Sequence, residues 1–187
     1  MLALVEAPPE NACVMFADQS DVGLYPPVGA QWGERGKQDK VHTRGNNRKA
    51  YLFGALDAHS DRLYAGFWTR KNSDAFVEFL RALLAAIPDR SIYLILDNYG
   101  VHKSKKTRAF LASEEGRRLT VVFLPTYSPW LNRIEISWRV IKARAATKKT
   151  SLRDASRVTT SVMRCCRSLP VSVMLRSVVC DEASPAQ

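Results

Sequence analysis

Three carboxylates that lie far apart in the sequence could together form a metal-dependent site. Asp18 lies near the end of a short apolar run at residues 13–20, and Asp97 lies near the end of a continuous apolar run at 91–98. Glu135 falls in the first turn of an amphipathic helical pattern. A carboxylate at the end of a buried strand is costly to bury without a partner. Each acid alone could cap a turn, pair with a base or bind a metal ion.

The order of the predicted elements brings the two aspartates together. Apolar and aromatic runs predict strands at 13–20, 50–59, 62–70, 91–98 and 119–125, the second and third forming a hairpin. Helical patterns cover 73–88, 103–115 and 132–147, and a last helix begins near Ser151. This order predicts an α/β fold, a mixed five-stranded sheet of three antiparallel and then parallel strands, with helices on both faces. The first and fourth strands should be parallel neighbours, which places Asp18 beside Asp97.

Two carboxylates so close together repel, and one of them would take up a proton unless a cation lay between them. Hard oxygen ligands of this kind suit Mg²⁺ or Mn²⁺. Glu135 shares a helix face with Arg139 and Lys142. It is either a third metal ligand or half of an ordinary Glu135–Arg139 surface pair worth about 0.2–0.5 kcal/mol. The spacing alone leaves both interpretations open.

The chain is strongly basic, with 28 Lys and Arg against 18 Asp and Glu among 187 residues and a net charge of +10. This balance suggests a polyanionic partner, most commonly nucleic acid, although a basic protein without such a partner is the alternative. Phosphate contacts of this type supply affinity without reading sequence. The candidate DNA-binding residues are Lys103, Lys105, Lys106, Arg133, Arg139, Lys142 and Arg144.

Several classes of protein are disfavoured. The four cysteines show no zinc-ligand spacing and give no sign of an oxidising compartment. The N-terminus lacks the pattern of a signal peptide, and no apolar run approaches the eighteen residues of a membrane span. We therefore expect a cytoplasmic protein with no membrane partner.

Three stretches carry a family resemblance: FADQSDVGLYPPVGAQWGERG, YLILDNYGVHKSK and LPTYSPWLNRIEISWRVIKAR. In these motifs, residues 12–165 resemble the DDE-type catalytic domain of mariner-superfamily transposases, in their bacterial insertion-sequence branch. The resemblance implies an RNase H-like fold in which Asp18, Asp97 and Glu135 are the catalytic and metal-binding residues. It also divides the chain into an N-terminal linker remnant (1–11), the catalytic domain (12–170) with an inserted loop or clamp (21–49), and a C-terminal tail (171–187).

The chemistry implied by the resemblance is hydrolysis of DNA phosphodiesters at transposon ends, followed by strand transfer into target DNA. It implies two Mg²⁺ or Mn²⁺ ions, a double-stranded DNA partner, a homodimer in the synaptic complex and a nucleoid-associated location in the bacterial cytoplasm. The alternatives are another RNase H-like nuclease, which cuts without joining, and an inactive remnant that only binds DNA.

Three polar residues are expected to support the acids. Asn98 and His102 follow Asp97 in the same motif, and His102 either contacts a phosphate or the attacking water, or braces the loop. Asn132 is predicted to cap the helix that carries Glu135.

The chain departs from the family pattern in two ways. Gln19 stands where the family usually has an acid, and it should point to the opposite face of its strand from Asp18. The chain also begins almost at the first strand, so we expect it to lack the family's N-terminal helix-turn-helix region.

Overall fold

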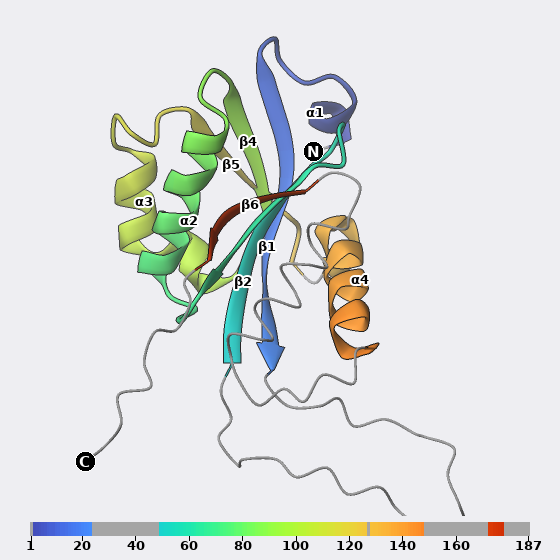
Figure 1. Cartoon of the computed structure of the whole chain (residues 1–187). Coiled ribbons are helices and arrows are strands. Elements are labelled where there is room, and N and C mark those ends of the chain that lie inside the picture. The colour runs from blue at the N-terminus through green and yellow to red at the C-terminus, as the bar shows by residue number, and fades with distance from the viewer. Residues whose placement is uncertain (1, 24–48, 127, 148–171, 178–187) are drawn as a thin grey trace, which may run out of the picture.

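A six-stranded sheet forms the centre of the computed structural model, which describes residues 2–23, 49–126, 128–147 and 172–177. The strand order is β5-β4-β1-β2-β3-β6 (Figure 1). The strands are β1 (Ala12–Gly23), β2 (Lys49–Asp57), β3 (Leu63–Trp68), β4 (Ser91–Leu96), β5 (Leu119–Phe123) and β6 (Ser172–Ser177).

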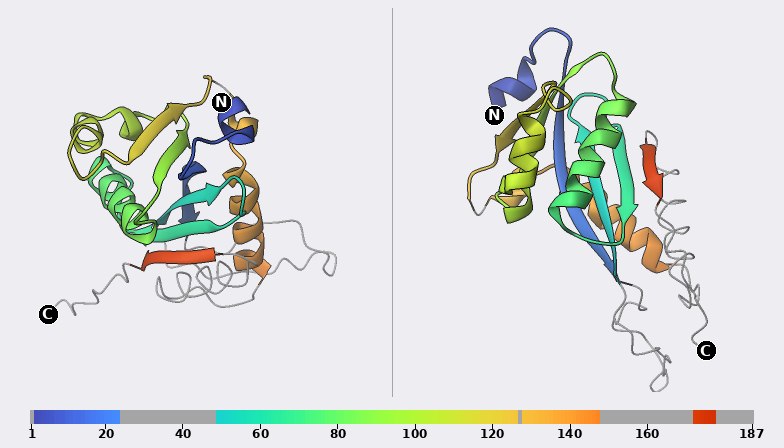
Figure 2. Two further views of the ribbon diagram at one scale, coloured as in Figure 1. Left: turned by 90° about the horizontal axis from the view of Figure 1, so that it is seen from above. Right: turned by 90° about the vertical axis from the view of Figure 1, so that its left-hand side faces the viewer.

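Helices cover both faces of this sheet. The α-helices are α1 (Leu2–Glu6), α2 (Ser73–Ala86), α3 (Lys105–Leu111) and α4 (Ile134–Thr147), and two short 3₁₀ helices are η1 (Gly100–Lys103) and η2 (Pro129–Leu131). Helices α2 and α3 lie on one face and α4 lies on the other, as the views in Figure 2 show.

The strand pairing confirms the predicted mixed sheet. Strand β1 pairs antiparallel with β2, and β2 pairs antiparallel with β3, which is the expected hairpin. Strand β4 is parallel to β1, and β5 is parallel to β4.

Two elements were not predicted. Strand β6 pairs parallel with β3 and adds a sixth strand inside the segment interpreted as a C-terminal tail. Helix α1 lies inside the segment interpreted as a linker. Residues 24–48, which form most of the predicted inserted loop, and the helix predicted from Ser151 lie outside the described residues.

Alternation along β1 divides the core into two layers, because successive strand side chains point to opposite faces. Cys13, Met15 and Ala17 join the layer that packs on α2, whereas Val14 and Phe16 join the layer that packs on α4. Helix α2 contributes a stripe of four buried residues at helical spacing, Phe76, Leu80, Leu83 and Leu84. Helix α4 contributes Ile134, Trp138 and Ile141, which are at most 2% exposed. The two layers therefore hold β1 firmly between the helices.

Gly54 of β2 lies directly under α4. A Cβ atom at this position would come within 2.5 Å of Cη2 of Trp138. We therefore predict that Gly54→Ala lowers the free energy of unfolding by about 1–3 kcal/mol, the usual cost of overpacking a core. Urea denaturation would measure the change. Gly100→Ala is the matched control, since nothing lies within 4 Å of its Cβ position. Equal stability of the two variants would show that the contact between β2 and α4 is not tight.

Candidate active site

The parallel register of β1 and β4 places Asp18 and Asp97 at the same level of the sheet. Phe16 lies opposite Ile95, and each aspartate is two residues further along its own strand direction. Phe16 and Ile95 both belong to the core layer under α4. Since residues two apart in a strand share a face, Asp18 is placed towards the α4 side of the sheet. Asp97 follows directly after the last residue of β4, at the same edge of the sheet.

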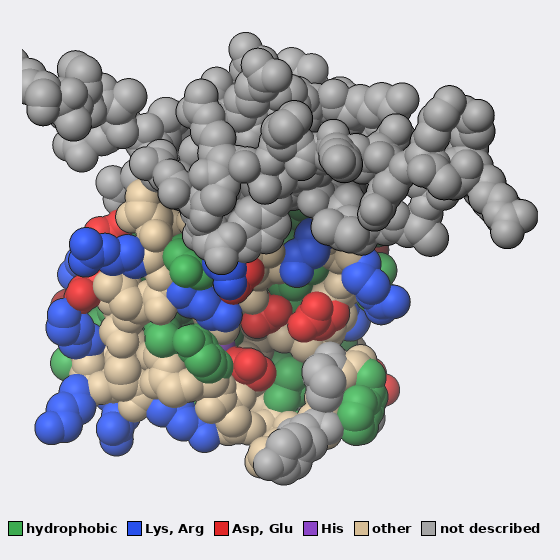
Figure 3. Space-filling model, turned by 90° about the horizontal axis from the view of Figure 1, so that it is seen from below, with side chains coloured by type: hydrophobic (Ala, Val, Ile, Leu, Met, Phe, Trp, Pro, Cys, Tyr) green, Lys and Arg blue, Asp and Glu red, His purple; other side chains and the backbone are tan. Residues whose placement is uncertain are grey.

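Glu135, in the first turn of α4, completes an acidic cluster. The pKa of Asp18 is raised from 3.8 to about 6, mainly by burial and also by the negative charges of Glu135 and Asp97. Hydrogen bonds from the Gln19 backbone and the Trp138 side chain oppose this shift. The three acids are therefore close enough to interact electrostatically. Viewed from the end towards which β1 runs, acidic side chains gather near the centre of the face, with Lys and Arg around them (Figure 3).

The acids do not form a finished metal site. Within the described ranges, no group of three or more His, Cys, Asp or Glu side chains is arranged so that it could hold a metal ion. The donor chemistry nevertheless fits a hard divalent cation, because all three groups offer carboxylate oxygens. The charges of Glu135 and Asp97 contribute to the raised pKa of Asp18, and a bound cation would offset their repulsion. Side-chain movement, above all of the exposed Glu135, would be needed for one ion to reach all three.

Trp138 holds the Asp18 carboxylate from the α4 side. Its Nε1 donates a hydrogen bond of 3.0 Å to Oδ2 of Asp18, and the residue is only 2% exposed. Trp138 belongs to the buried stripe of α4, and the sequence did not predict its polar contact. Its position three residues after Glu135 on the same helix is the only signal that could have suggested it.

His102 holds Asp97 from the other side. Its Nδ1 lies 3.0 Å from Oδ1 of Asp97 and 3.2 Å from the Asp97 carbonyl oxygen. Its Nε2 lies 3.1 Å from Oε1 of Gln19, and the ring packs on Phe76 with 4.6 Å between centroids. The hydrogen bond from His102 is the main reason why the pKa of Asp97 is lowered. Since the His102 side chain is fully buried, the geometry favours bracing over contact with a phosphate.

Two asparagines tie the strand ends around the acids. Asn98 Nδ2 donates to the Leu124 carbonyl oxygen at 2.6 Å, which links the segment after β4 to the segment after β5. Asn132 Nδ2 donates to the Ala17 carbonyl oxygen at 3.2 Å, and its Oδ1 accepts from the Ile134 backbone N–H at 3.4 Å. Asn132 therefore caps the start of α4, as expected, and also joins that start to β1.

Three predicted DNA-binding residues make contacts within the chain. Lys103 donates to Oδ1 of Asn98 and lies 4.7 Å from the Phe123 ring centroid. The others form ion pairs: Lys106 with Asp74 at 2.7 Å, and Arg133 with Asp61 at 3.1 Å. Arg133 also donates to the Ala58 carbonyl oxygen at 2.9 Å.

The other predicted DNA-binding residues are less constrained. Lys105, Arg139 and Lys142 are exposed, while the Arg144 side chain lies outside the described part of the chain.

Lys71, after β3, is a basic residue that the sequence analysis did not single out. Its Nζ lies 3.6 Å from Oδ1 of Asp21 and 4.9 Å from the centroid of the Tyr99 ring. Its charge also contributes to the lowered pKa of Asp97. No local motif marks this lysine, because only the folded sheet brings the end of β3 near the end of β4.

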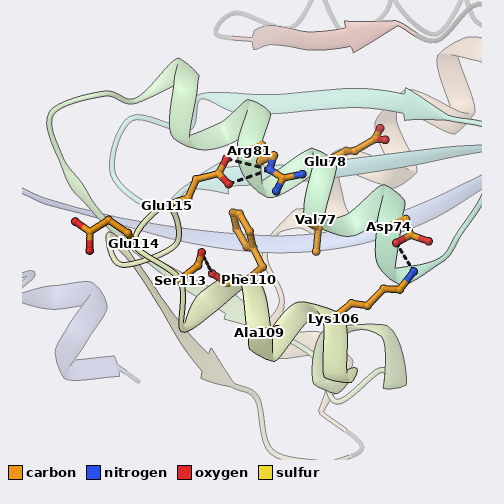
Figure 4. Close-up of a pocket in the computed structure, with 10 residues that line it drawn as sticks. All are labelled: Asp74, Val77, Glu78, Arg81, Lys106, Ala109, Phe110, Ser113, Glu114 and Glu115. Carbon is orange, nitrogen blue, oxygen red and sulfur yellow. Dashed lines mark hydrogen bonds and ion pairs between the residues drawn. The ribbon is translucent and has the colours of Figure 1, made fainter.

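A separate pocket lies between α2 and α3 (Figure 4). Two ion pairs cross it: Asp74 with Lys106 of α3, and Arg81 with Glu115 of the turn after α3, whose closest atoms are 2.9 Å apart. Phe110 forms part of its floor. The lining includes none of the three clustered acids, and four of its charged residues pair with one another in these two ion pairs. The pocket is therefore best explained as the packing boundary of α2 and α3.

The model of the family described as DDE superfamily endonuclease matches residues 13–159. The chain belongs to this family. A curated relative is the 39 kDa protein of insertion element IS630 from Shigella sonnei, to which this chain is 37% identical over 129 residues. That alignment covers 68% of this chain and 37% of the relative, so the chain matches little more than a third of the relative's length.

Solved structures agree on the fold. The Mos1 strand transfer complex matches with a TM-score of 0.59 at 17% identity, covering 81% of this chain and 45% of that chain. The simian T-cell lymphotropic virus intasome matches with a TM-score of 0.58 at 13% identity, covering 85% of this chain and 49% of the intasome chain. This DDE superfamily member therefore has the RNase H-like fold of transposase and integrase catalytic domains. Among its described helices, none is both long and apolar enough to span a membrane.

Replacement of Asp18 should change how stability depends on pH. The pKa of Asp18 is about 6 in the folded state, against an ordinary value of 3.8. Between these two pH values the folded state therefore binds more protons than the unfolded state. As a result, the free energy of unfolding falls as the pH rises from 3.8 to about 6. Asp18→Asn removes the ionisable group and with it this loss of stability at neutral pH. We predict that, without divalent ions, the variant is more stable than wild type at pH 7 by roughly 1–2 kcal/mol after allowance for solvent screening.

Urea denaturation at pH 7 and at pH 3.5 would test this prediction, since the difference should vanish at the lower pH. Asp97→Asn is the matched control with the opposite sign, because the pKa of Asp97 is lowered and its ionised form stabilises the fold at neutral pH. If Asp18→Asn were less stable than wild type at pH 7, burial and the neighbouring charges would not disfavour the ionised form of Asp18 as described.

Proposed function

We propose that this chain is the catalytic domain of a transposase that hydrolyses DNA phosphodiesters at transposon ends and then transfers the strand into target DNA. The observation that carries the proposal is the matched placement of Asp18 in β1 and Asp97 directly after β4, with the charge of Glu135 acting on Asp18. The insertion-element relative and the fold shared with the Mos1 complex support the choice of transposition among the reactions of the family.

In this proposal Asp18, Asp97 and Glu135 hold two Mg²⁺ or Mn²⁺ ions. When bound, such ions would supply a lower pKa for the attacking water and charge neutralisation at the leaving oxygen of an in-line displacement. Magnesium and manganese are named in structures that share this fold, the HTLV-2 integrase core and the Mos1 paired-end complex. Trp138 and His102 keep the Asp18 and Asp97 carboxylates in place, so less reorganisation is needed when the ions bind.

Double-stranded DNA is the proposed substrate. The exposed Lys105, Arg139 and Lys142 are available to contact phosphates, and Lys71 lies close to Asp97. Synapsis of two transposon ends would require at least a homodimer. Activity in the bacterial cytoplasm at the nucleoid follows from the same proposal.

The metal-dependent cleavage can be tested with a supercoiled plasmid and Mg²⁺. We predict that wild type nicks the plasmid and that Asp97→Asn is slower by about 1,000-fold, because a bound metal supplies several kcal/mol of transition-state stabilisation. Asp74→Asn is the matched control: it is the same substitution at an exposed aspartate of α2, outside the acidic cluster. Equal nicking by wild type and Asp97→Asn would show that the active site lies elsewhere.

Strand transfer separates a transposase from an RNase H-like nuclease that only cuts. A short duplex carrying a transposon end with a free 3′-hydroxyl would be incubated with the chain, Mn²⁺ and a target plasmid. We predict covalent joining of the duplex to the plasmid, which a gel would show, and its loss in Glu135→Gln. Cleavage of the plasmid without any joined product would favour the nuclease.

A further inference from the structure

Gln19, on β1, contacts Asp18 directly and is linked to Asp97 through His102. Its backbone forms a hydrogen bond that lowers the pKa of the neighbouring Asp18. Its side chain lies on the opposite face of the strand, where Oε1 is 3.1 Å from Nε2 of His102. His102 in turn reaches Asp97 through Nδ1. The residue thus joins β1 to the end of β4 by a route separate from the strand pairing.

The hydrogen-bond partners of His102 determine which of its ring nitrogens carries the proton. Nδ1 of His102 faces two oxygens of Asp97, a carboxylate at 3.0 Å and the backbone carbonyl at 3.2 Å, so Nδ1 must carry the proton. A Gln amide can donate or accept by turning over, so it can satisfy Nε2 in either ring state. The Gln19 side chain is the partner that keeps the ring turned towards Asp97.

Burial makes the arrangement rigid. Gln19 is 8% exposed and His102 is 1% exposed, and the imidazole is packed on Phe76 of α2. A buried nitrogen that loses its partner pays the full cost of desolvation. Loss of the Gln19 amide would therefore favour rotation of the ring away from its present position, and Oδ1 of Asp97 would lose its donor.

We infer that Gln19 is a positioning residue for Asp97, acting through the His102 ring to hold the carboxylate in the orientation that binds the divalent ion. The inference rests on the proposed function, in which Asp97 is a metal ligand. Partners of this kind around metal ligands typically change metal affinity by about 10- to 100-fold.

The test uses the full chain, Mn²⁺ titration by calorimetry and ¹⁵N NMR of the histidine rings without metal. We predict that Gln19→Met weakens Mn²⁺ binding by about 10-fold and exposes the Nδ1 proton of His102 to faster exchange. Gln19→Glu keeps an oxygen next to Nε2 and should bind Mn²⁺ at least as tightly as wild type.

Thr107→Val is the control for general loosening of this region. Thr107 is buried and donates to the Val101 carbonyl oxygen at 2.8 Å, without contact to Gln19 or Asp97. This variant should lose stability and keep the Mn²⁺ affinity of wild type.

Three outcomes would overturn the inference. They are Mn²⁺ affinity in Gln19→Met equal to that of wild type, an equal loss of affinity in Thr107→Val, and weakened affinity with an unchanged His102 signal. If wild type itself bound no Mn²⁺, the proposed function would fail and the inference with it. The wild-type titration therefore separates that failure from a failure of the Gln19 contact alone.

Discussion

Parallel pairing of β1 with β4 is the constraint on which the candidate site depends. It sets Asp18 of β1 level with Asp97, which directly follows β4, and α4 adds Glu135 to the same region. The fold thus gathers negative charge where burial already disfavours it, which is why the pKa of Asp18 reaches about 6. A divalent ion would turn this repulsion into attraction. The proposed metal binding and the proposed catalysis therefore both depend on the pairing of β1 with β4.

The acids are supported from both faces of the sheet. On one face, Trp138 fits over Gly54 and donates to Asp18, so the small residue in β2 makes room for the group that orients the carboxylate. On the other face, His102 packs on α2 and holds Asp97. The layered core therefore limits how far the two aspartates can move, whereas Glu135 is exposed at the start of α4 and is the acid best able to move.

Periodicity was enough to predict five of the six strands, because buried strands leave clear patterns, and their order predicted the parallel pairing of β1 with β4. It did not predict β6, whose six residues, SVMLRS, were assigned to the C-terminal tail. Contacts such as Lys71 near Asp97 and Gln19 on His102 join residues distant in sequence, and no local pattern encodes them. Gln19 was correctly placed opposite Asp18, but its link to Asp97 depends on where His102 folds.

A crystal of the chain soaked in Mn²⁺, with data collected at the manganese absorption edge, tests the central claim most directly. The account predicts two anomalous peaks about 3.5–4 Å apart, bound by the carboxylates of Asp18, Asp97 and Glu135. Manganese bound elsewhere, with these three carboxylates too far apart to share an ion pair, would contradict it.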